Sequence, residues 1–291
     1  MNPSPSEPAV QWLPGGRLHL RHGPIDLVLQ AWGAEAAVRA SYKAAWARFG
    51  SVLPELAGEL AELRRPMAER PRAESPVGRR MTAACRPYRD FVTPMAAVAG
   101  AVADEILEAM TEAAPLDRAF VNDGGDIAVH LTEGEEIAVA IAADFARGPV
   151  PAVNGAVTLR HGDGIGGIAT SGAQGRSFSL GIADSVTVLA RTAAAADVAA
   201  TLVANAVDVG PHPAVERRPA RELDPDSDLG WRPVTVAVGP LSADEIAAAL
   251  AAGRARAESY RAAGLIRDAA LSLRGTVLVL GPLARIQEIA S

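Results

Sequence analysis

The pattern of apolar and polar positions predicts a hairpin and helices in the first part of the chain. Residues 16–33 alternate in hydrophobicity on either side of Gly23-Pro24, which predicts two strands around a tight turn. From Ala34 to about Leu63 the apolar side chains recur with helical spacing. Pro54 lies inside this run and predicts a split into two helices, because proline lacks the N–H that a helix interior uses.

The next segment is rich in proline and arginine. Residues 64–90 hold four prolines and many arginines, and we expect them to form an exposed loop. A solvated connector is the simpler interpretation, and a basic surface for a phosphate-bearing ligand is the alternative. Residues 94–113 then predict a helix whose small side chains allow another backbone to approach closely.

Consecutive short apolar runs between long helices predict an α+β fold rather than strict alternation of strand and helix. A Pro- and charge-rich link is expected over 210–233, and a C-terminal strand-helix-strand extension over 234–291, its helix starting with a capping box at Ser242–Glu245. The strands predicted in the middle of the chain are 118–122, 126–131, 135–142, 155–160, 167–172 and 177–190, with a helix over 195–208.

Composition limits the class of protein. The 291 residues are 49% apolar and 21% charged, as in ordinary globular proteins, and the net charge of -6 argues against a broad nucleic-acid-binding surface. One cysteine excludes a disulfide framework. No apolar run is long enough for a membrane span, and the first residues lack the features of a signal peptide, so we expect a cytoplasmic protein. Residues 1–16 are expected to be disordered or extended, and 17–291 to form one domain.

Two glycine motifs have competing interpretations. Residues 162–167 fit G-x-G-x-x-G, but a strand-like segment follows instead of a helix, so we expect a turn rather than a dinucleotide site. Gly124-Gly125 lies between Asp123 and Asp126, a pattern typical of a hairpin turn. The alternative is a bare backbone that lies against a ligand, with carboxylates beside it.

Small polar side chains gather in the segment after residue 169. Thr170, Ser171, Ser177 and Ser179 stand among glycines, and exposed amides and hydroxyls suit a phosphate or a ring carbonyl. A polar loop without a ligand fits the composition equally well. The chain has no G-x-S-x-G motif, which gives a serine hydrolase little support.

The helix expected over 195–208 carries a narrow polar stripe. Asp197, Thr201, Asn205 and Asp208 fall on one face because they are spaced four, four and three residues apart. The pair Asp197 and Thr201 offers a carboxylate and a hydroxyl to one hard cation such as Mg²⁺. A plain solvent-facing stripe is the alternative.

Several of these segments together resemble the ApbE-like superfamily. TPMAAVAGAVAD, VNDGGDI, ATSGAQGRSFSLGIADSVTVLA and ADVAATLVANAV occur in the family's order over about residues 17–210. FAD:protein FMN transferases are the characterised members, and this chain is more similar to a bacterial and archaeal (UPF) branch. The resemblance implies an α+β, ApbE-like fold of two packed subdomains with mixed or antiparallel sheets.

The resemblance also implies a ligand and its site. In the transferases a backbone carbonyl and an Asp/Thr pair hold Mg²⁺ near the FAD pyrophosphate, which correspond here to Val98, Asp197 and Thr201. We therefore expect FAD or FMN, or a similar phosphate-bearing small molecule, together with Mg²⁺. The residues expected to border it are Gly124, Gly125, Asp126, Thr170, Ser171, Gly172 and Arg176.

The chain departs from the transferase pattern at two places. Ala99 stands where transferases have lysine, and their His-x-x-Asp-Pro segment is absent. We therefore expect flavin transfer to an acceptor protein to be absent or very slow, with Asp184 as the best local base. One alternative is an enzyme of other small-molecule chemistry centred on Ser177 and Asp184, and another is a non-catalytic accessory or assembly protein. A homo-oligomer is compatible with each.

Overall fold

The computed structural model describes residues 7–144, 152–175 and 177–281, which form two compact units. The first unit extends to Ile137 and adds Arg160–Ala169 and Arg191–Asp197. The second comprises Ala138–Leu159, Thr170–Ala190 and the residues from Val198 onward. Strand β8 (Gly167–Ser171) and helix α4 (Ala193–Ala206) contribute residues to both.

The first unit is built on antiparallel strands. Its order is β1 (Ala9–Leu13), β2 (Arg17–His22), β3 (Ile25–Trp32), β4 (Arg118–Asp123) and β5 (Asp126–Leu131), each paired with the next, and β8 pairs with β5. Alternate residues of β3 are buried, as its sequence pattern predicts. The predicted hairpin is confirmed, and Gly23 turns it with a φ of +58°.

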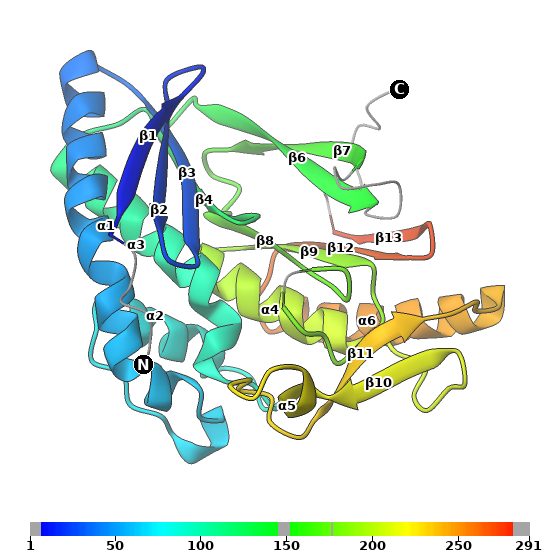
Figure 1. Cartoon of the computed structure of the whole chain (residues 1–291). Helices are drawn as coiled ribbons and strands as arrows, with labels where there is room; N and C mark the ends of the chain where they lie inside the picture. Colours follow the sequence, from blue (N-terminus) through cyan, green and yellow to red (C-terminus); the bar gives the residue numbers. More distant parts are fainter. Residues whose placement is uncertain (1–6, 145–151, 176, 282–291) are drawn as a thin grey trace. The chain divides into compact units, whose positions relative to one another are not determined.

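Helices α1 (Glu35–Leu63) and α3 (Val98–Ala113) pack against each other and against the strands β2 to β5 (Figure 1). The prediction that Pro54 splits the first helical run is wrong, because α1 continues through it. Phe49 and Val52 before the proline and Leu56 after it are all buried on one face. Packing of this continuous face offsets the loss of one hydrogen bond at the proline.

The prediction of a loop over 64–90 is also wrong in part. Residues Met67–Glu69 form a short 3₁₀ helix, η1, and α2 covers Pro76–Cys85. Ser75 caps α2 by accepting a hydrogen bond from the N–H of Gly78 at 3.0 Å, and Pro76 occupies the first helical position. The dipeptide Ser75-Pro76 was the available signal, but the surrounding prolines obscured it.

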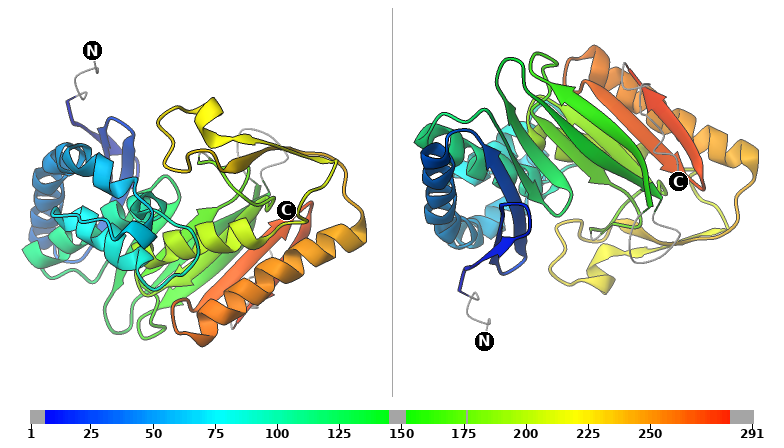
Figure 2. Two further views of the ribbon diagram at one scale, coloured as in Figure 1. Left: turned by 90° about the horizontal axis from the view of Figure 1, so that it is seen from below. Right: turned by 90° about the horizontal axis from the view of Figure 1, so that it is seen from above.

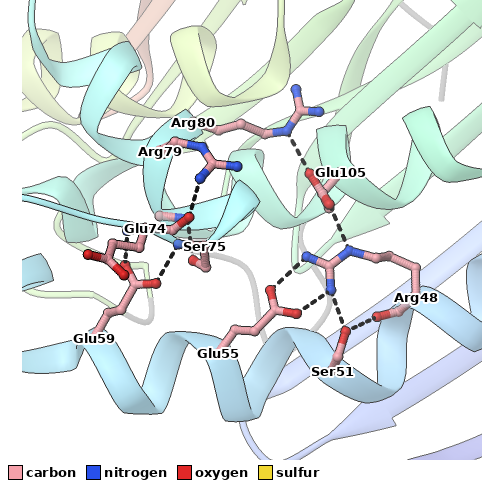
Figure 3. A network of polar contacts seen from close by, with 10 residues as sticks. Arg48, Ser51, Glu55, Glu59, Glu74, Ser75, Arg79, Arg80 and Glu105 are labelled. Atoms are coloured by element: carbon pink, nitrogen blue, oxygen red, sulfur yellow. Dashed lines mark hydrogen bonds and ion pairs between the residues drawn. The ribbon is translucent and has the colours of Figure 1, made fainter.

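A polar network fixes α2 against α1 and α3 (Figure 3). The guanidinium of Arg48 contacts Glu105 at 2.7 Å and Glu55 at 2.8 Å, and Arg80 contacts the second oxygen of Glu105 at 2.8 Å. Glu59 accepts the N–H of Ser75 at 2.5 Å and so holds the start of α2. These arginines and carboxylates bond one another or the backbone and so hold the three helices together.

The second unit also combines antiparallel strands with a helix. Strand β12 (Asp268–Leu273) lies between β9 (Ser185–Ala190) and β13 (Thr276–Leu280), and α6 (Ala243–Ala262) lies along β12 and β13 (Figures 1 and 2). The capping box predicted at the start of α6 is present, with Ser242 and Glu245 bonded reciprocally. Strands β6 (Glu136–Asp144) and β7 (Ala152–Arg160) form a separate pair.

Two predictions in the second unit need correction. The expected link over 210–233 contains β10 (Val215–Pro219), which pairs with β11 (Pro233–Val238), and a short helix, α5 (Ala220–Leu223). The pairing partner lies well downstream, so no local pattern reveals it. In the run 177–190, only β9 is a strand.

The fold class is therefore α+β with antiparallel strands, as the sequence predicts. Within the described ranges, every helix is too short or too polar to span a bilayer.

Candidate functional site

Helices α3 and α4 cap each other with carboxylates inside the first unit. Asp197 on α4 accepts a hydrogen bond from the N–H of Gly100 in the first turn of α3, at 3.0 Å. Asp104 on α3 accepts from the N–H groups of Ala193 and Ala194 at the start of α4, both at 2.9 Å. Each carboxylate satisfies N–H groups that a helix start leaves unpaired, and each lies at the positive end of a helix dipole.

Glycines allow this close approach. A Cβ atom at Gly100 would lie 2.4 Å from the carbonyl oxygen of Ala193, and one at Gly167 would lie 2.1 Å from the Ala193 nitrogen. The expected close approach of a backbone to the small-residue helix is therefore confirmed. Gly166 and Gly167 end the G-x-G-x-x-G match, and they lie against residues 191–193 beyond a turn instead of opening a helix.

The environment of Asp197 disfavours its negative charge. Burial raises the pKa of Asp197 well above its usual range, and the nearby carboxylate of Asp126 raises it further. The N–H of Gly100 lowers the pKa, while Asp123 again raises it. Burial also raises the pKa of Asp104, to about 6, against the lowering effect of the two N–H groups that it accepts.

The turn between β4 and β5 supplies the neighbouring carboxylates. Gly124 and Gly125 close the hairpin with φ angles of +62° and +118°, and Asp123 pairs directly with Asp126. Asn122 accepts the N–H of Gly125 at 2.8 Å and fixes the turn. The predicted hairpin is confirmed, and the same hairpin brings two carboxylates near Asp197.

The polar stripe of α4 divides into two parts. Asn205 accepts the N–H of Leu180 at 2.9 Å, and Asp208 forms an ion pair with Arg217, so both serve the second unit's own structure. Asp197 faces the start of α3, and Thr201 follows it by one turn on α4. The stripe is thus neither a uniform solvent face nor a uniform metal face.

Hard oxygen donors in the first unit suit a cation such as Mg²⁺. No three His, Cys, Asp or Glu side chains converge as a metal-binding group among the residues that the structure describes. The family resemblance implies only one such side chain as a ligand, Asp197. Val98, whose carbonyl is implied as a ligand, is the first residue of α3.

The second unit contains the predicted Thr/Ser/Gly segment. The hydroxyl of Thr170 bonds that of Thr187 at 2.9 Å, Ser171 ends β8, and Gly172 packs with its Cβ position 2.4 Å from the carbonyl oxygen of Asp184. Ser177 is exposed, and Arg176 lies outside the described residues.

Asp184 also has fixed contacts. Its carboxylate accepts a hydrogen bond from the side chain of Gln174 at 3.1 Å and another from the backbone N–H of Arg274. The backbone N–H of Asp184 donates to the carbonyl of Ser272 at 2.9 Å. The predicted catalytic role of Ser177 and Asp184 stays a prediction.

A family model described as AbpE bacteria matches residues 10–279. The chain belongs to the AbpE bacteria family. Among curated relatives of this AbpE family chain, a UPF0280 protein of Methanothrix thermoacetophila is 45% identical over 117 residues, which are 40% of the chain and 46% of the relative. A UPF0280 protein of Methanothermobacter thermautotrophicus is 34% identical over 151 residues, 51% of the chain and 55% of the relative. The chain thus spans about half the length of these relatives.

A solved structure confirms the fold of the AbpE family chain. The ApbE protein of Thermotoga maritima matches with a TM-score of 0.53 at 11% identity, over 97% of this chain and 98% of that one. The expected resemblance to the ApbE-like superfamily, in its UPF0280 branch, is confirmed by these findings together.

Sequence reasoning about this AbpE family chain missed the role of Asp104. Its partners Ala193 and Ala194 lie about ninety residues away, and no local pattern connects them. A partial signal was present, because Asp104 and Asp197 both belong to segments that carried the family resemblance.

Proposed function

We propose that this protein binds a flavin nucleotide, FAD or FMN, together with Mg²⁺ beside Asp197. The observation that carries the proposal is the position of Asp197 at the start of α3, near the carboxylates of Asp126 and Asp123. A divalent cation there would offset the free-energy cost of burying the negative charge and reduce the repulsion between the carboxylates.

Backbone groups of α3 and of the turn between β4 and β5 contribute to the proposed site in different ways. The N–H groups of Gly100 and Ala99 orient the Asp197 carboxylate and still leave lone pairs for a cation. The bound Mg²⁺ would neutralise phosphate charge. At Gly125 a Cβ atom would meet nothing within 4 Å, so the turn presents open backbone beside which a flat ring can lie. Val98 and Gly124 of the same unit are proposed as further contacts. The roles expected of Thr201, Thr170, Ser171, Gly172 and Arg176 stay predictions.

Covalent transfer of FMN to an acceptor protein is proposed to be very slow. Ala99 stands at the position of the transferase lysine, and its N–H serves Asp197 instead. Loss of a positioned acid or base lowers rates by about 10²–10⁴-fold. Incubation with FAD, Mg²⁺ and an acceptor protein, followed by in-gel fluorescence under denaturing conditions, tests this. Robust labelling that disappears in Asp197→Asn would overturn the proposal of slow transfer.

The binding proposal is tested by calorimetric titration of FMN with Mg²⁺ and with EDTA. We expect Mg²⁺ to raise the FMN affinity of the wild-type protein at least about tenfold. Asp197→Asn keeps an oxygen that can accept the N–H of Gly100, but it loses the charge that a cation needs. We therefore expect this variant to bind FMN with no dependence on Mg²⁺.

The reciprocal caps supply a matched control. Asp104→Asn alters the equivalent carboxylate cap of α4 and removes the same charge. We expect Asp104→Asn to keep the full Mg²⁺ effect. Equal Mg²⁺ dependence in both variants, or no FMN binding by the wild-type protein, would overturn the proposal.

A further inference from the structure

The first unit contains a second feature, a cavity of about 770 Å³ whose lining includes neither Gly100 nor Ala99, the residues bonded to Asp197. Its walls come from η1, from the end of α2 and from the segment that follows α2. Three arginines line it, together with two aromatic side chains and one carboxylate: Arg70, Arg86, Arg89, Tyr88, Phe91 and Asp90. We call this the arginine groove. Ligand pockets for small molecules typically enclose about 300–1,000 Å³.

The arginines of the groove differ from Arg48 and Arg80 of the same unit. Arg48 and Arg80 are held by buried or half-buried carboxylates (Figure 3). Within the described residues, the guanidinium groups of Arg70, Arg86 and Arg89 have no hydrogen-bond or ion-pair partner, and all three residues are exposed. Asp90 is the one acidic residue in the lining, so the groove carries an excess of positive charge.

The groove is preformed by backbone contacts. The N–H of Met67 donates to the carbonyl of Val92 at 2.9 Å and joins the two sides. Arg70 has a left-handed φ of +55°, which is unusual for a residue other than glycine, and its N–H bonds the Met67 carbonyl at 3.0 Å. The thiol of Cys85 lies 3.4 Å from the carbonyl oxygen of Thr93 and anchors the end of α2.

We infer that the arginine groove binds a nucleoside phosphate. Guanidinium groups pair with phosphate oxygens in a bidentate fork, and a groove with several unpartnered ones favours a multiply charged anion. The half-buried Phe91 and the buried Tyr88 place aromatic rings in the same lining, and a flat base can pack against Phe91. The inference does not use Asp197, and Gly100 and Ala99, whose N–H groups bond Asp197, are not in the groove lining.

ADP is the probe, titrated by calorimetry in EDTA so that no Mg²⁺-dependent binding contributes. The variant Arg86→Gln/Arg89→Gln removes two of the unpartnered charges. Because each hydrogen bond to a charged group contributes substantially to binding, we expect its ADP affinity to fall at least about tenfold. Pyrophosphate tests the charge alone and adenosine the ring alone, and both are expected to bind at least about tenfold more weakly than ADP.

Two control variants keep the outcome interpretable. Arg79 lies on α2 outside the groove and donates to the carbonyl of Glu74, so Arg79→Gln removes a charge nearby without touching the lining. We expect Arg79→Gln and Asp197→Asn to bind ADP as the wild-type protein does. Absent ADP binding, equal binding by the double arginine variant, or a loss in Asp197→Asn as large as in that variant would each overturn the inference.

Discussion

The two units each contain a cavity lined by an arginine with a left-handed backbone. The guanidinium group of this arginine has no partner in one cavity and is hydrogen-bonded in the other. In the arginine groove, Arg70 has a φ of +55° and a guanidinium without a partner among the described residues. In the second unit, Arg274 has a φ of +51°, lines a cavity of about 150 Å³, and donates its guanidinium to the carbonyl of Gly239 at 2.9 Å.

The partners decide what each cavity is able to bind. Around Arg274, the carboxylate of Asp184 is bonded to the Arg274 N–H and to Gln174, so the polar groups there hold segments of the chain together. The volume of the arginine groove is about five times larger, and its three guanidinium groups form no hydrogen bond or ion pair with other described residues. Residue type alone does not separate the two cavities, because each is lined by arginine and aspartate.

The largest effect is expected where an arginine partner is removed. Glu105 is 8% exposed and bridges Arg48 and Arg80. Glu105→Ala leaves Arg48, which is only 18% exposed, without this partner, and we expect a loss of roughly 3–5 kcal/mol in unfolding free energy. Urea denaturation measures it. Glu108→Ala is the control, because the 51% exposed Glu108 pairs with Arg80 at the surface. Equal losses in the two variants would contradict the burial argument.

The next largest effect is expected from Asp104, whose raised pKa makes the unfolding free energy depend on pH. Its pKa is about 6 in the fold against the usual 3.8, so the folded protein binds the extra proton between these values. Stability therefore falls as pH rises from about 4 to 6, by up to about 2–3 kcal/mol from this group. Denaturation at a series of pH values measures the slope. Asp104→Asn should reduce it by that amount, and an unchanged slope would refute the assignment.

Local patterns explain which parts of the fold were predictable. The alternation in 16–33 and the Ser242/Glu245 box are decided by neighbouring residues, and both predictions are confirmed. Pro54 misled the prediction because the buried face that carries α1 past it depends on packing with α3. Similarly, β10 needs its partner β11, and the start of α2 needs Glu59.

The candidate sites were predictable only as far as chemistry shows in the sequence. The Asp197/Thr201 spacing and the GGD turn are local patterns, whereas the reciprocal cap by Asp104 joins residues distant in the chain. The basic composition of 64–90 pointed to phosphate binding as an alternative. It could not separate Arg80, whose guanidinium pairs with Glu105, from Arg86, whose guanidinium has no partner among the described residues.

A smaller effect is expected from breaking the second cavity's contacts. Asp184→Ala removes acceptors for the Arg274 N–H and the Gln174 side chain, at a site that is half-buried. We expect a loss of about 1–2 kcal/mol in unfolding free energy, with ADP affinity unchanged. Thermal and urea denaturation measure the first quantity and calorimetry the second. A fall in ADP affinity without a loss of stability would transfer the ligand from the arginine groove to this cavity.

The smallest effect on stability is expected from the groove arginines themselves, and it sharpens the comparison most. Arg86 and Arg89 are exposed and their guanidinium groups have no partner among the described residues, so Arg86→Gln and Arg89→Gln remove no hydrogen bond or ion pair of these groups. Each should change the unfolding free energy by less than about 0.5 kcal/mol, as is usual for surface substitutions. Removing a positive charge from a like-charged cluster even tends to stabilise the free protein. In saturating ADP, however, the wild-type protein should gain more in melting temperature than either variant, because a ligand stabilises only the state it binds. Equal gains would show that the groove's charges serve neither the fold nor this ligand.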